Sequence, residues 1–248
     1  MDLRLTDLSP QSDDPRYVPG DLMDFQAVLG LLEGVDAVVH LAMADPHSVG
    51  SENPEAPNAR DELLMRVNMG TTYNILEAAR QCGVGRVVYA SSLTVHLGNK
   101  HRESYHSTTP LEPNSLYACT KLFGEQLARV YWLQHGVSTI CLRIGQPFPI
   151  GNQTYDDLWR TNKRARSNFV EIRDVARALA CGVHTEESFG LFNVVSASDN
   201  QRFDLSETRQ IGYVPRAYLD DEGLRFFEEG NFPPPTGPVV THNPGEAS

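Results

Sequence analysis

The chain has 248 residues, 40% of them hydrophobic and 21% charged, which is typical of one globular domain with a sizeable core. Its 21 lysines and arginines against 32 aspartates and glutamates leave a formal net charge of −11, which argues against nucleic acid or an anionic membrane as a partner. No apolar run reaches the roughly 18–20 residues of a membrane helix, and we expect no signal peptide. The four cysteines are widely scattered, so we expect a cytoplasmic protein with reduced thiols and no metal site.

Helix-like and strand-like segments alternate along the chain. Amphipathic periodicity predicts helices at 25–32, 61–82 and 115–135 and within 169–182, and apolar runs predict strands at 36–42, 86–90, 137–144 and 191–195, after a short strand-like piece at 3–5. This alternation predicts an α/β protein with a doubly wound parallel sheet whose strands are buried on both faces. We assign residues 1–222 to this domain, with a small substrate-binding portion near its C-terminal end. Residues 223–248 are expected to form a disordered tail.

Hydroxyl, phenol and ammonium groups are expected to meet at one edge of this sheet. Ligands of doubly wound sheets bind at the carboxyl ends of the strands, and strand 86–90 runs directly into hydroxyl residues that include Ser92 and Thr94. The next helix carries Tyr117 and Lys121, whose spacing of four places them one turn apart on one face. A nearby ammonium stabilises a phenolate and lowers the phenol pKa, ordinarily near 10. With Ser92 holding the substrate oxygen, Tyr117 is suited to take a proton from an alcohol while a hydride leaves its carbon.

Several stretches of the chain, in the same order, resemble the extended short-chain dehydrogenases/reductases of the NAD-dependent epimerase/dehydratase family. The matching stretches lie at 20–24, 38–42, 67–79, 87–94, 117–125, 142–144 and 170–178. An isolated Tyr-x-x-x-Lys is a weak signal, whereas several motifs in the right order are specific. The resemblance covers most of residues 1–222 and implies a Rossmann-like, NAD(P)-binding domain.

The resemblance also implies roles for individual residues. Ser92, Tyr117 and Lys121 match the family's catalytic residues, and the tyrosine and lysine also contact the nicotinamide end of the cofactor. Asp7 matches the acidic residue that binds the adenosine ribose, where a carboxylate repels a 2′-phosphate and favours NAD over NADP. The further positions that match cofactor contacts are Asp21, Leu22, Leu41, Ala42 and Asn68.

Three residues are candidates for contact with the substrate: Ser92, Thr94 and Arg143. A surface ion pair is an equally supported role for Arg143, and Asn68 is equally suited to a structural role inside its helix. The basic run at 160–166 is expected to be a solvated face, and His40 a packed core residue.

Within the family, residues 143–149 and 196–200 are similar to uronate dehydrogenases, which oxidise the anomeric carbon of a hexuronic acid to a lactone. The chain differs from that group at positions expected to recognise the substrate. Leu93 and Thr94 stand where the group tends to have Asn-His, and Gln146 stands where a serine is common. The expected substrate therefore stays open among a sugar, a uronate and a sugar nucleotide.

The family's Gly-x-x-Gly-x-x-Gly turn, whose amides cradle the pyrophosphate of the cofactor, does not occur in this sequence. By the resemblance, residue 1 falls just before the second family strand, so that the first strand, the glycine loop and the first helix are missing. We expect apolar surface to be exposed on the neighbouring strand. Two interpretations follow: a truncated form of an active enzyme, which an intact Ser-Tyr-Lys set favours, or a natural short form with weakened or lost cofactor binding.

The sequence thus supports two functional hypotheses. The first is an NAD-dependent oxidoreductase or epimerase acting on a sugar, uronate or sugar-nucleotide hydroxyl, with Tyr117 as the general base. The second is a truncated or non-catalytic Rossmann-like binding module with weak or no NAD binding. The resemblance also implies a homodimer formed through the helices at 61–82 and 115–135.

Overall fold

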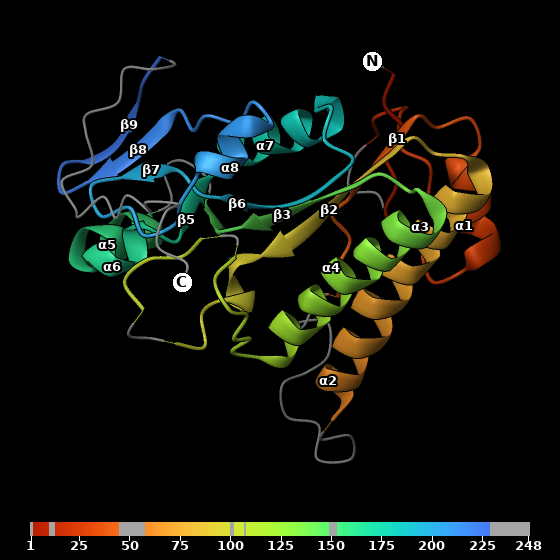
Figure 1. Ribbon diagram of the computed structural model, residues 1–248, viewed down its shortest axis with the longest axis horizontal. Helices are drawn as coiled ribbons and strands as arrows, with labels where there is room; N and C mark the ends of the chain where they lie inside the picture. Colours follow the sequence, from red (N-terminus) through yellow and green to blue (C-terminus); the bar gives the residue numbers. More distant parts are fainter. Residues whose placement is uncertain are drawn as a thin grey trace, which may run out of the picture.

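Four parallel strands form the central sheet in the order β1 (Ala37–His40), β2 (Arg86–Ser92), β3 (Thr139–Ile144) and β6 (Phe189–Val194). The computed structural model describes residues 2–9, 13–44, 58–99, 102–106, 108–148 and 153–228, without the side chains of 153–156. Helices α3 (Gly70–Cys82) and α4 (Leu116–His135) lie side by side on one face of the sheet, and α7 (Ile172–His184) packs on the other (Figure 1). This confirms the α/β, Rossmann-like fold.

The helices begin and end close to where the sequence predicts. Asp24 caps α1 (Phe25–Leu32) by accepting hydrogen bonds from the first-turn amides, and Gly83 and Gly136 end α3 and α4 at φ angles of 70° and 69°, which glycine adopts without strain. The predicted helix at 61–82 consists of α2 (Ala59–Leu64), a π-helical turn η1 (Met65–Met69) and α3. A short 3-10 turn, η2 (Leu93–Val95), follows β2.

The C-terminal part adds two small sheets to this frame. One pairs β4 (Gln146–Phe148) with β5 (Phe169–Glu171), and the other has the order β7 (Ala197–Ser198), β8 (Ala217–Asp220), β9 (Gly223–Phe226). Helices α5 (Gln153–Thr161), α6 (Lys163–Arg166) and α8 (Ser206–Gln210) connect them. The prediction of a disordered tail at 223–248 is wrong for residues 223–226, because they form β9, which pairs antiparallel with β8. Residues 229–248 lie outside the described residues.

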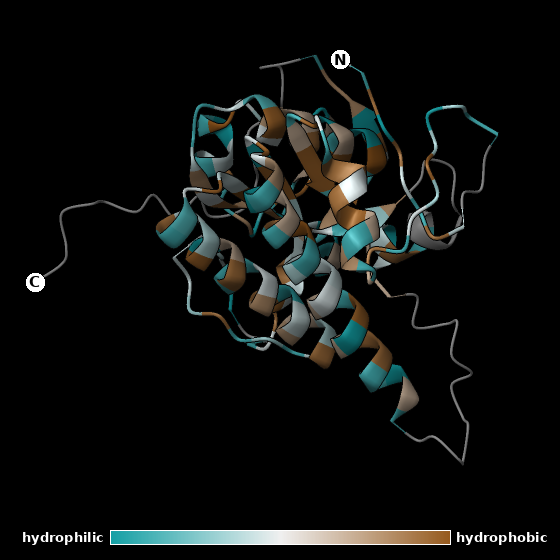
Figure 2. Cartoon of the chain, turned by 90° about the vertical axis from the view of Figure 1, so that its right-hand side faces the viewer, coloured by the Kyte–Doolittle hydropathy of each residue, from teal (hydrophilic) through white to brown (hydrophobic). Residues whose placement is uncertain are grey.

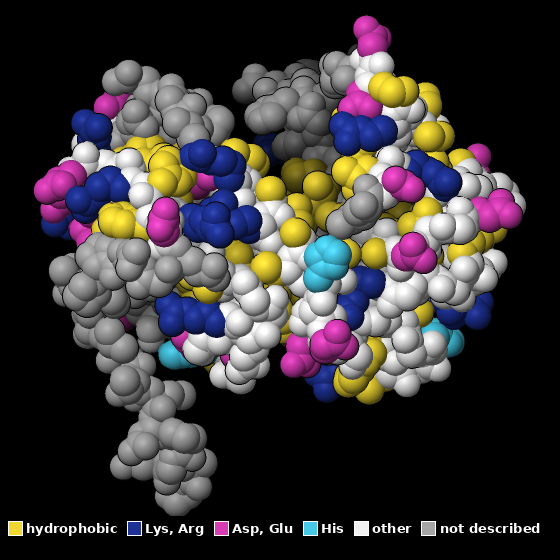
Figure 3. All heavy atoms as spheres, turned by 90° about the horizontal axis from the view of Figure 1, so that it is seen from above, with side chains coloured by type: hydrophobic (Ala, Val, Ile, Leu, Met, Phe, Trp, Pro, Cys, Tyr) yellow, Lys and Arg dark blue, Asp and Glu magenta, His cyan; other side chains and the backbone are white. Residues whose placement is uncertain are grey.

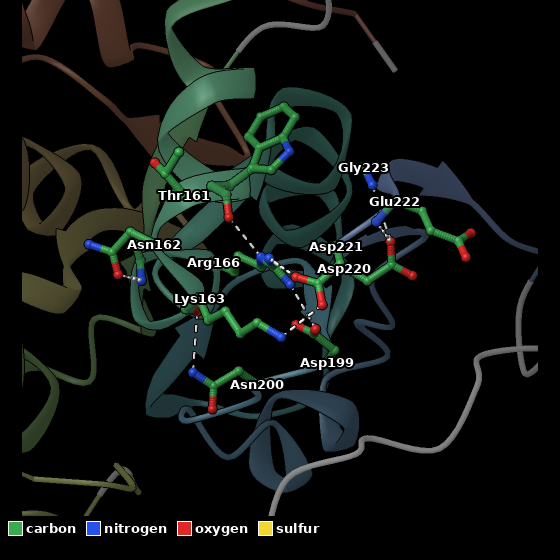
Figure 4. Close-up of polar contacts among 12 residues, drawn as sticks. Thr161, Asn162, Lys163, Arg166, Asp199, Asn200, Asp220, Asp221, Glu222 and Gly223 are labelled. Atoms are coloured by element: carbon green, nitrogen blue, oxygen red, sulfur yellow. Dashed lines mark hydrogen bonds and ion pairs between the residues drawn. The ribbon is translucent and has the colours of Figure 1, made fainter.

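One buried arginine side chain forms hydrogen bonds to three segments of this C-terminal part. Arg166 is fully buried, and its guanidinium donates to the carbonyl of Trp159 at 2.7 Å, to Asp199 at 2.7 Å and to Asp221 (Figure 4). Lys163 adds a bond to Asp221 at 2.7 Å. The expectation of a solvated basic face at 160–166 is therefore wrong for Arg166, because two carboxylates from β7–β9 and its connections compensate the buried charge.

Strand β1 is covered on one face only. His40 is buried toward α3, whereas Val39 and Leu41 on the opposite face are 40% and 51% exposed. Among the described strands, β2 alone pairs with β1, which therefore ends the sheet. The prediction that β1 is buried on both faces is therefore wrong, and apolar side chains are exposed on this strand as expected.

The ribbons of the long helices in Figure 2 carry both hydrophilic and hydrophobic residues. The exposed apolar side chains of η1, α3 and α4 include Met65, Tyr73, Val130 and Leu133, the last 62% exposed. None of the described helices is both long enough and apolar enough to cross a membrane.

A glycine sets the distance between α4 and β2. A Cβ on Gly124 would overlap the phenol group of Tyr89, a β2 residue that is 3% exposed and packed in the core. No other residue allows this approach, so the sequence of α4 brings its face directly against the strand.

We expect Gly124→Ala to lower the free energy of unfolding by about 1–3 kcal/mol, since the buried Tyr89 ring has no room to move away. Thermal or urea unfolding measures this change. The control is Gly30→Ala in α1, where nothing lies within 4 Å of the added carbon and we expect a gain of about 0.5–1 kcal/mol. An equal response of the two variants would contradict the close packing described above.

Candidate active site

The carboxyl end of β2 presents two hydroxyl groups. Ser92 is the last residue of the strand and is 8% exposed. Its Oγ accepts hydrogen bonds from the amide of Thr94 at 3.3 Å and from Thr94 Oγ1 at 3.0 Å. This cap holds Ser92 and Thr94 together at the edge of the sheet where ligands of parallel sheets bind.

The first turns of α4 bring a phenol and an amine to the same place. Ser115 caps the helix by accepting from the Ala118 amide at 3.2 Å. Lys121 is 3% exposed and donates to the carbonyl of Ala90 on β2 at 2.9 Å, and its Nζ lies 5.7 Å from the centre of the Tyr117 ring. The side chain of Ser92 lies near the phenol of Tyr117 and acts to lower its pKa. The structure thus gathers Ser92, Thr94, Tyr117 and Lys121.

Burial controls the charge of this group. It lowers the pKa of Lys121 from 10.5 to about 8, because a buried ammonium loses its hydration. Burial also raises the pKa of Tyr117 above 10, and the side chain of Ser92 opposes that rise only in part. The expected lowering of the phenol pKa by Lys121 is therefore wrong, since desolvation of the phenolate is the larger effect.

The polar side chains near the Lys121 amine include His40 and Tyr89, and both are uncharged. His40 Nε2 is 3.2 Å from Thr72 Oγ1, and burial together with the Lys121 charge lowers the pKa of His40 to about 3, so that this imidazole is neutral at physiological pH. The Tyr89 ring is tilted against the His40 ring at a centre-to-centre distance of 5.8 Å, and the Nζ of Lys121 lies 5.3 Å from the Tyr89 ring centre. His40 is thus a core residue, as expected.

Asn68 joins two parts of the site rather than facing outward. It lies in the π-helical turn η1 and is 2% exposed. Its Oδ1 accepts from the Ala44 amide, just beyond β1, at 2.8 Å, and its Nδ2 donates to Thr120 Oγ1 on α4 at 3.0 Å. Both ends of the amide are satisfied by protein, so the structural role proposed for Asn68 is the one that the geometry favours.

The residues matched to the adenosine end lie in the N-terminal segment. The carbonyl of Asp7 accepts from the Gly20 amide at 3.2 Å, which brings Asp7 close to Asp21 and Leu22. Asp7 and Asp21 are exposed, and their carboxylates accept hydrogen bonds from the amides of Ser9 at 3.3 Å and of Met23 at 2.8 Å, respectively. Leu41 and Ala42 follow β1 at the same sheet edge as Ser92.

Arg143 does not reach the surface of the site. Its guanidinium is 1% exposed and forms a bidentate pair with Glu125 of α4, with Nε to Oε1 and Nη2 to Oε2 both at 2.8 Å. Both roles considered for Arg143, substrate contact and surface ion pair, are wrong, because its side chain points under α4 rather than out of the sheet edge. Glu125, to which the sequence analysis gave no role, lies one turn after Lys121, and that repeat of the four-residue spacing is the signal that identifies it.

The described residues include groups suited to bind the nicotinamide ribose and the adenosine ribose of a dinucleotide, and fewer groups suited to its pyrophosphate. Lys121 uses one of three ammonium donors on Ala90, which leaves donors for ribose hydroxyls, and the exposed Asp7 carboxylate suits an adenosine ribose. Figure 3, which views the molecule from above, shows hydrophobic side chains at the floor of a hollow. In the described part of the chain, no cluster of three or more His, Cys, Asp or Glu side chains forms a metal site.

Comparisons with known proteins point to one family. Residues 4–158 match the NAD dependent epimerase/dehydratase family. A uronate dehydrogenase of Pseudomonas syringae pv. tomato is 31% identical over 220 residues, covering 86% of this chain and 72% of that protein. An L-arabinose 1-dehydrogenase (NAD(P)(+)) of Haloferax volcanii is 31% identical over 213 residues, covering 79% and 80%.

Solved structures give the same picture. The crystal structure of uronate dehydrogenase from Agrobacterium tumefaciens superposes with a TM-score of 0.70 at 29% identity, covering 89% of this chain and 77% of that one. A variant of that enzyme solved in complex with NAD has a TM-score of 0.69 at 28% identity, with the same coverage.

We expect Lys121→Met to stabilise the protein at neutral pH by removing a buried charge. The lowered pKa of Lys121 means that the unfolded chain binds more protons than the folded chain between about pH 8 and 10.5, so wild-type stability rises relative to the variant across that interval. The difference in unfolding free energy should shrink by about 3 kcal/mol. Urea unfolding of both proteins at pH 7.5 to 10.5, roughly the titration range of this lysine, measures it. A difference that is constant with pH would contradict the buried ammonium.

Proposed function

The chain belongs to the NAD-dependent epimerase/dehydratase family, and we propose that it is an NAD-dependent oxidoreductase that acts on a hydroxyl group of a sugar, uronate or sugar nucleotide. The observation that carries this proposal is the meeting of Ser92, Tyr117 and Lys121 at the carboxyl end of β2. The similarity to uronate and arabinose dehydrogenases supports the sugar as the class of substrate.

The residues of the chain supply binding and proton transfer. Ser92 holds the substrate hydroxyl against Tyr117, which accepts its proton as the carbon is oxidised. The Ser92 hydroxyl and the Lys121 ammonium stabilise the phenolate form on which this step depends. Bound NAD supplies the hydride acceptor. Because the pKa of Tyr117 is raised in the free protein, alcohol oxidation should be favoured at alkaline pH, where the phenol loses its proton.

Asp7, Asp21, Leu22, Leu41 and Ala42 would hold the adenosine half of NAD, and Lys121 with Tyr117 the nicotinamide ribose. Thr94, held by Ser92, faces the substrate in this proposal. The finer choice between a sugar, a uronate and a sugar nucleotide follows from the C-terminal part, including residues 196–200, which we propose as the substrate-binding portion.

The uncovered face of β1 favours a second candidate function. Without a glycine turn to cradle the pyrophosphate, the chain would be a Rossmann-like binding module with weak NAD affinity. Calorimetry with NAD separates the two candidates: affinity in the micromolar range supports the enzyme, and no heat of binding supports the module.

We further propose a cytoplasmic location. A homodimer through α3 and α4 also stays a proposal, and the exposed Tyr73, Val130 and Leu133 favour it.

We expect Tyr117→Phe to lower kcat by about 10²–10⁴-fold, since the phenyl ring keeps the packing but cannot take a proton. Formation of NADH from NAD across a panel of sugars, uronates and sugar nucleotides measures this effect. Tyr73→Phe is the matched control, because Tyr73 is 48% exposed on α3. Turnover in Tyr117→Phe equal to that of the wild type would overturn the assignment of Tyr117 as the base.

We expect Asp7→Ser to raise the preference for NADP over NAD by about tenfold, because it removes a carboxylate that repels the 2′-phosphate. The ratio of kcat/KM for the two cofactors measures it. Asp13→Ser, a change of another exposed carboxylate in the same segment, should leave the ratio unchanged. An unaltered ratio in Asp7→Ser would place the adenosine ribose elsewhere.

A further inference from the structure

A buried network of four side chains lies directly beneath the candidate active site. Its centre is the ion pair of Arg143 on β3 with Glu125 on α4, which are 1% and 0% exposed. Ser91 on β2 donates to Glu125 Oε1 at 2.6 Å, and Arg143 Nη1 donates to His96 Nε2 at 2.8 Å. We call these four residues the anchor network.

Three members of the anchor network lie close along the chain to a site residue, and the fourth, Arg143, lies on the neighbouring strand. Ser91 precedes Ser92 on β2, and Glu125 follows Lys121 by one helical turn. His96 directly follows η2, which Ser92 caps. Arg143 stands opposite Ser91 in the register of β2 with β3, so one guanidinium joins the strand, the helix and the turn.

The charges in the anchor network balance within it. One carboxylate faces one guanidinium, and both carboxylate oxygens accept from it. His96 accepts a hydrogen bond from Arg143, and burial together with that positive charge lowers the pKa of His96 to about 3, so the imidazole stays neutral. An ion pair desolvated to this extent is weak support for stability, because well-packed apolar residues often replace such pairs without loss. The hydrogen bonds of this pair are directional, so they restrict how its two side chains are oriented.

We propose that the anchor network is a positioning device for the proposed reaction: the Arg143–Glu125 pair, with Ser91 and His96, holds α4 and the end of β2 so that Tyr117 and Lys121 face Ser92. This inference rests on the proposed function for its catalytic consequence. It assigns positioning roles to Glu125 and Arg143, neither of which touches the reacting groups.

The test separates positioning from stability with a paired substitution. Glu125→Leu combined with Arg143→Met removes both charges and keeps the volume apolar, so the double variant should regain most of the thermal stability that Glu125→Gln alone loses by stranding a buried guanidinium. If the network positions the site, kcat of the folded double variant still falls by about 10- to 100-fold while KM for NAD changes little.

Hydrogen exchange gives a readout that needs no turnover. In the folded double variant, amides at 92–96 and 115–121 should exchange faster than in the wild type, while those of α1 and α7 keep their rates. Ser91→Ala is the milder variant if the double variant does not fold. It deletes one hydrogen bond to Glu125 and should lower kcat by about 3- to 10-fold, with faster exchange in the same two segments.

Glu77→Gln is the matched control, because Glu77 accepts from Tyr131 at 3.1 Å and so also contacts α4, roughly 21 Å along the helix from Tyr117. Its kcat should equal that of the wild type. Full kcat in a folded double variant, or unchanged exchange at both segments, would overturn the inference. If the wild-type chain turns over no substrate, the proposed function fails, and the exchange experiment alone decides whether the network holds the two segments.

Discussion

The close contact between helix α4 and strand β2 is the constraint on which the candidate site depends. Gly124 lets the helix approach the Tyr89 ring, and Lys121 then reaches the carbonyl of Ala90 at 2.9 Å. One turn further along, Glu125 accepts from Ser91 at 2.6 Å. Three successive points of contact therefore fix the rotation and the height of α4 over the strand, and the place of Tyr117 follows from them.

Burial both builds the site and sets its chemistry. The apolar surroundings that hold Lys121 rigid also lower its pKa to about 8, and the same desolvation raises the pKa of Tyr117. Burial thus favours the neutral form of both groups, although a pKa of about 8 leaves the Lys121 ammonium largely protonated at neutral pH. The oppositely charged pair of Arg143 and Glu125 lies beneath it.

The opposite side of the sheet has a different character. Val39 of β1 and Leu41 just beyond it remain partly exposed, on the face where α7 packs more against β2 and β3 than against β1. Exposed apolar side chains on an end strand are costly in water and favour contact with another apolar surface.

The sequence by itself determined the alternation of strands and helices and the ends of α1, α3 and α4 at glycines, and it proposed Ser92, Tyr117 and Lys121 as candidates, because local periodicity and short motifs carry that information. Only the tertiary structure decided that Arg143 points beneath α4, that Asn68 bridges Ala44 and Thr120, that residues 223–226 form a strand, and that one face of β1 is bare. The reason is physical: which side chain meets which partner, and which face loses its water, depends on contacts between segments far apart in the chain, and no local pattern contains them.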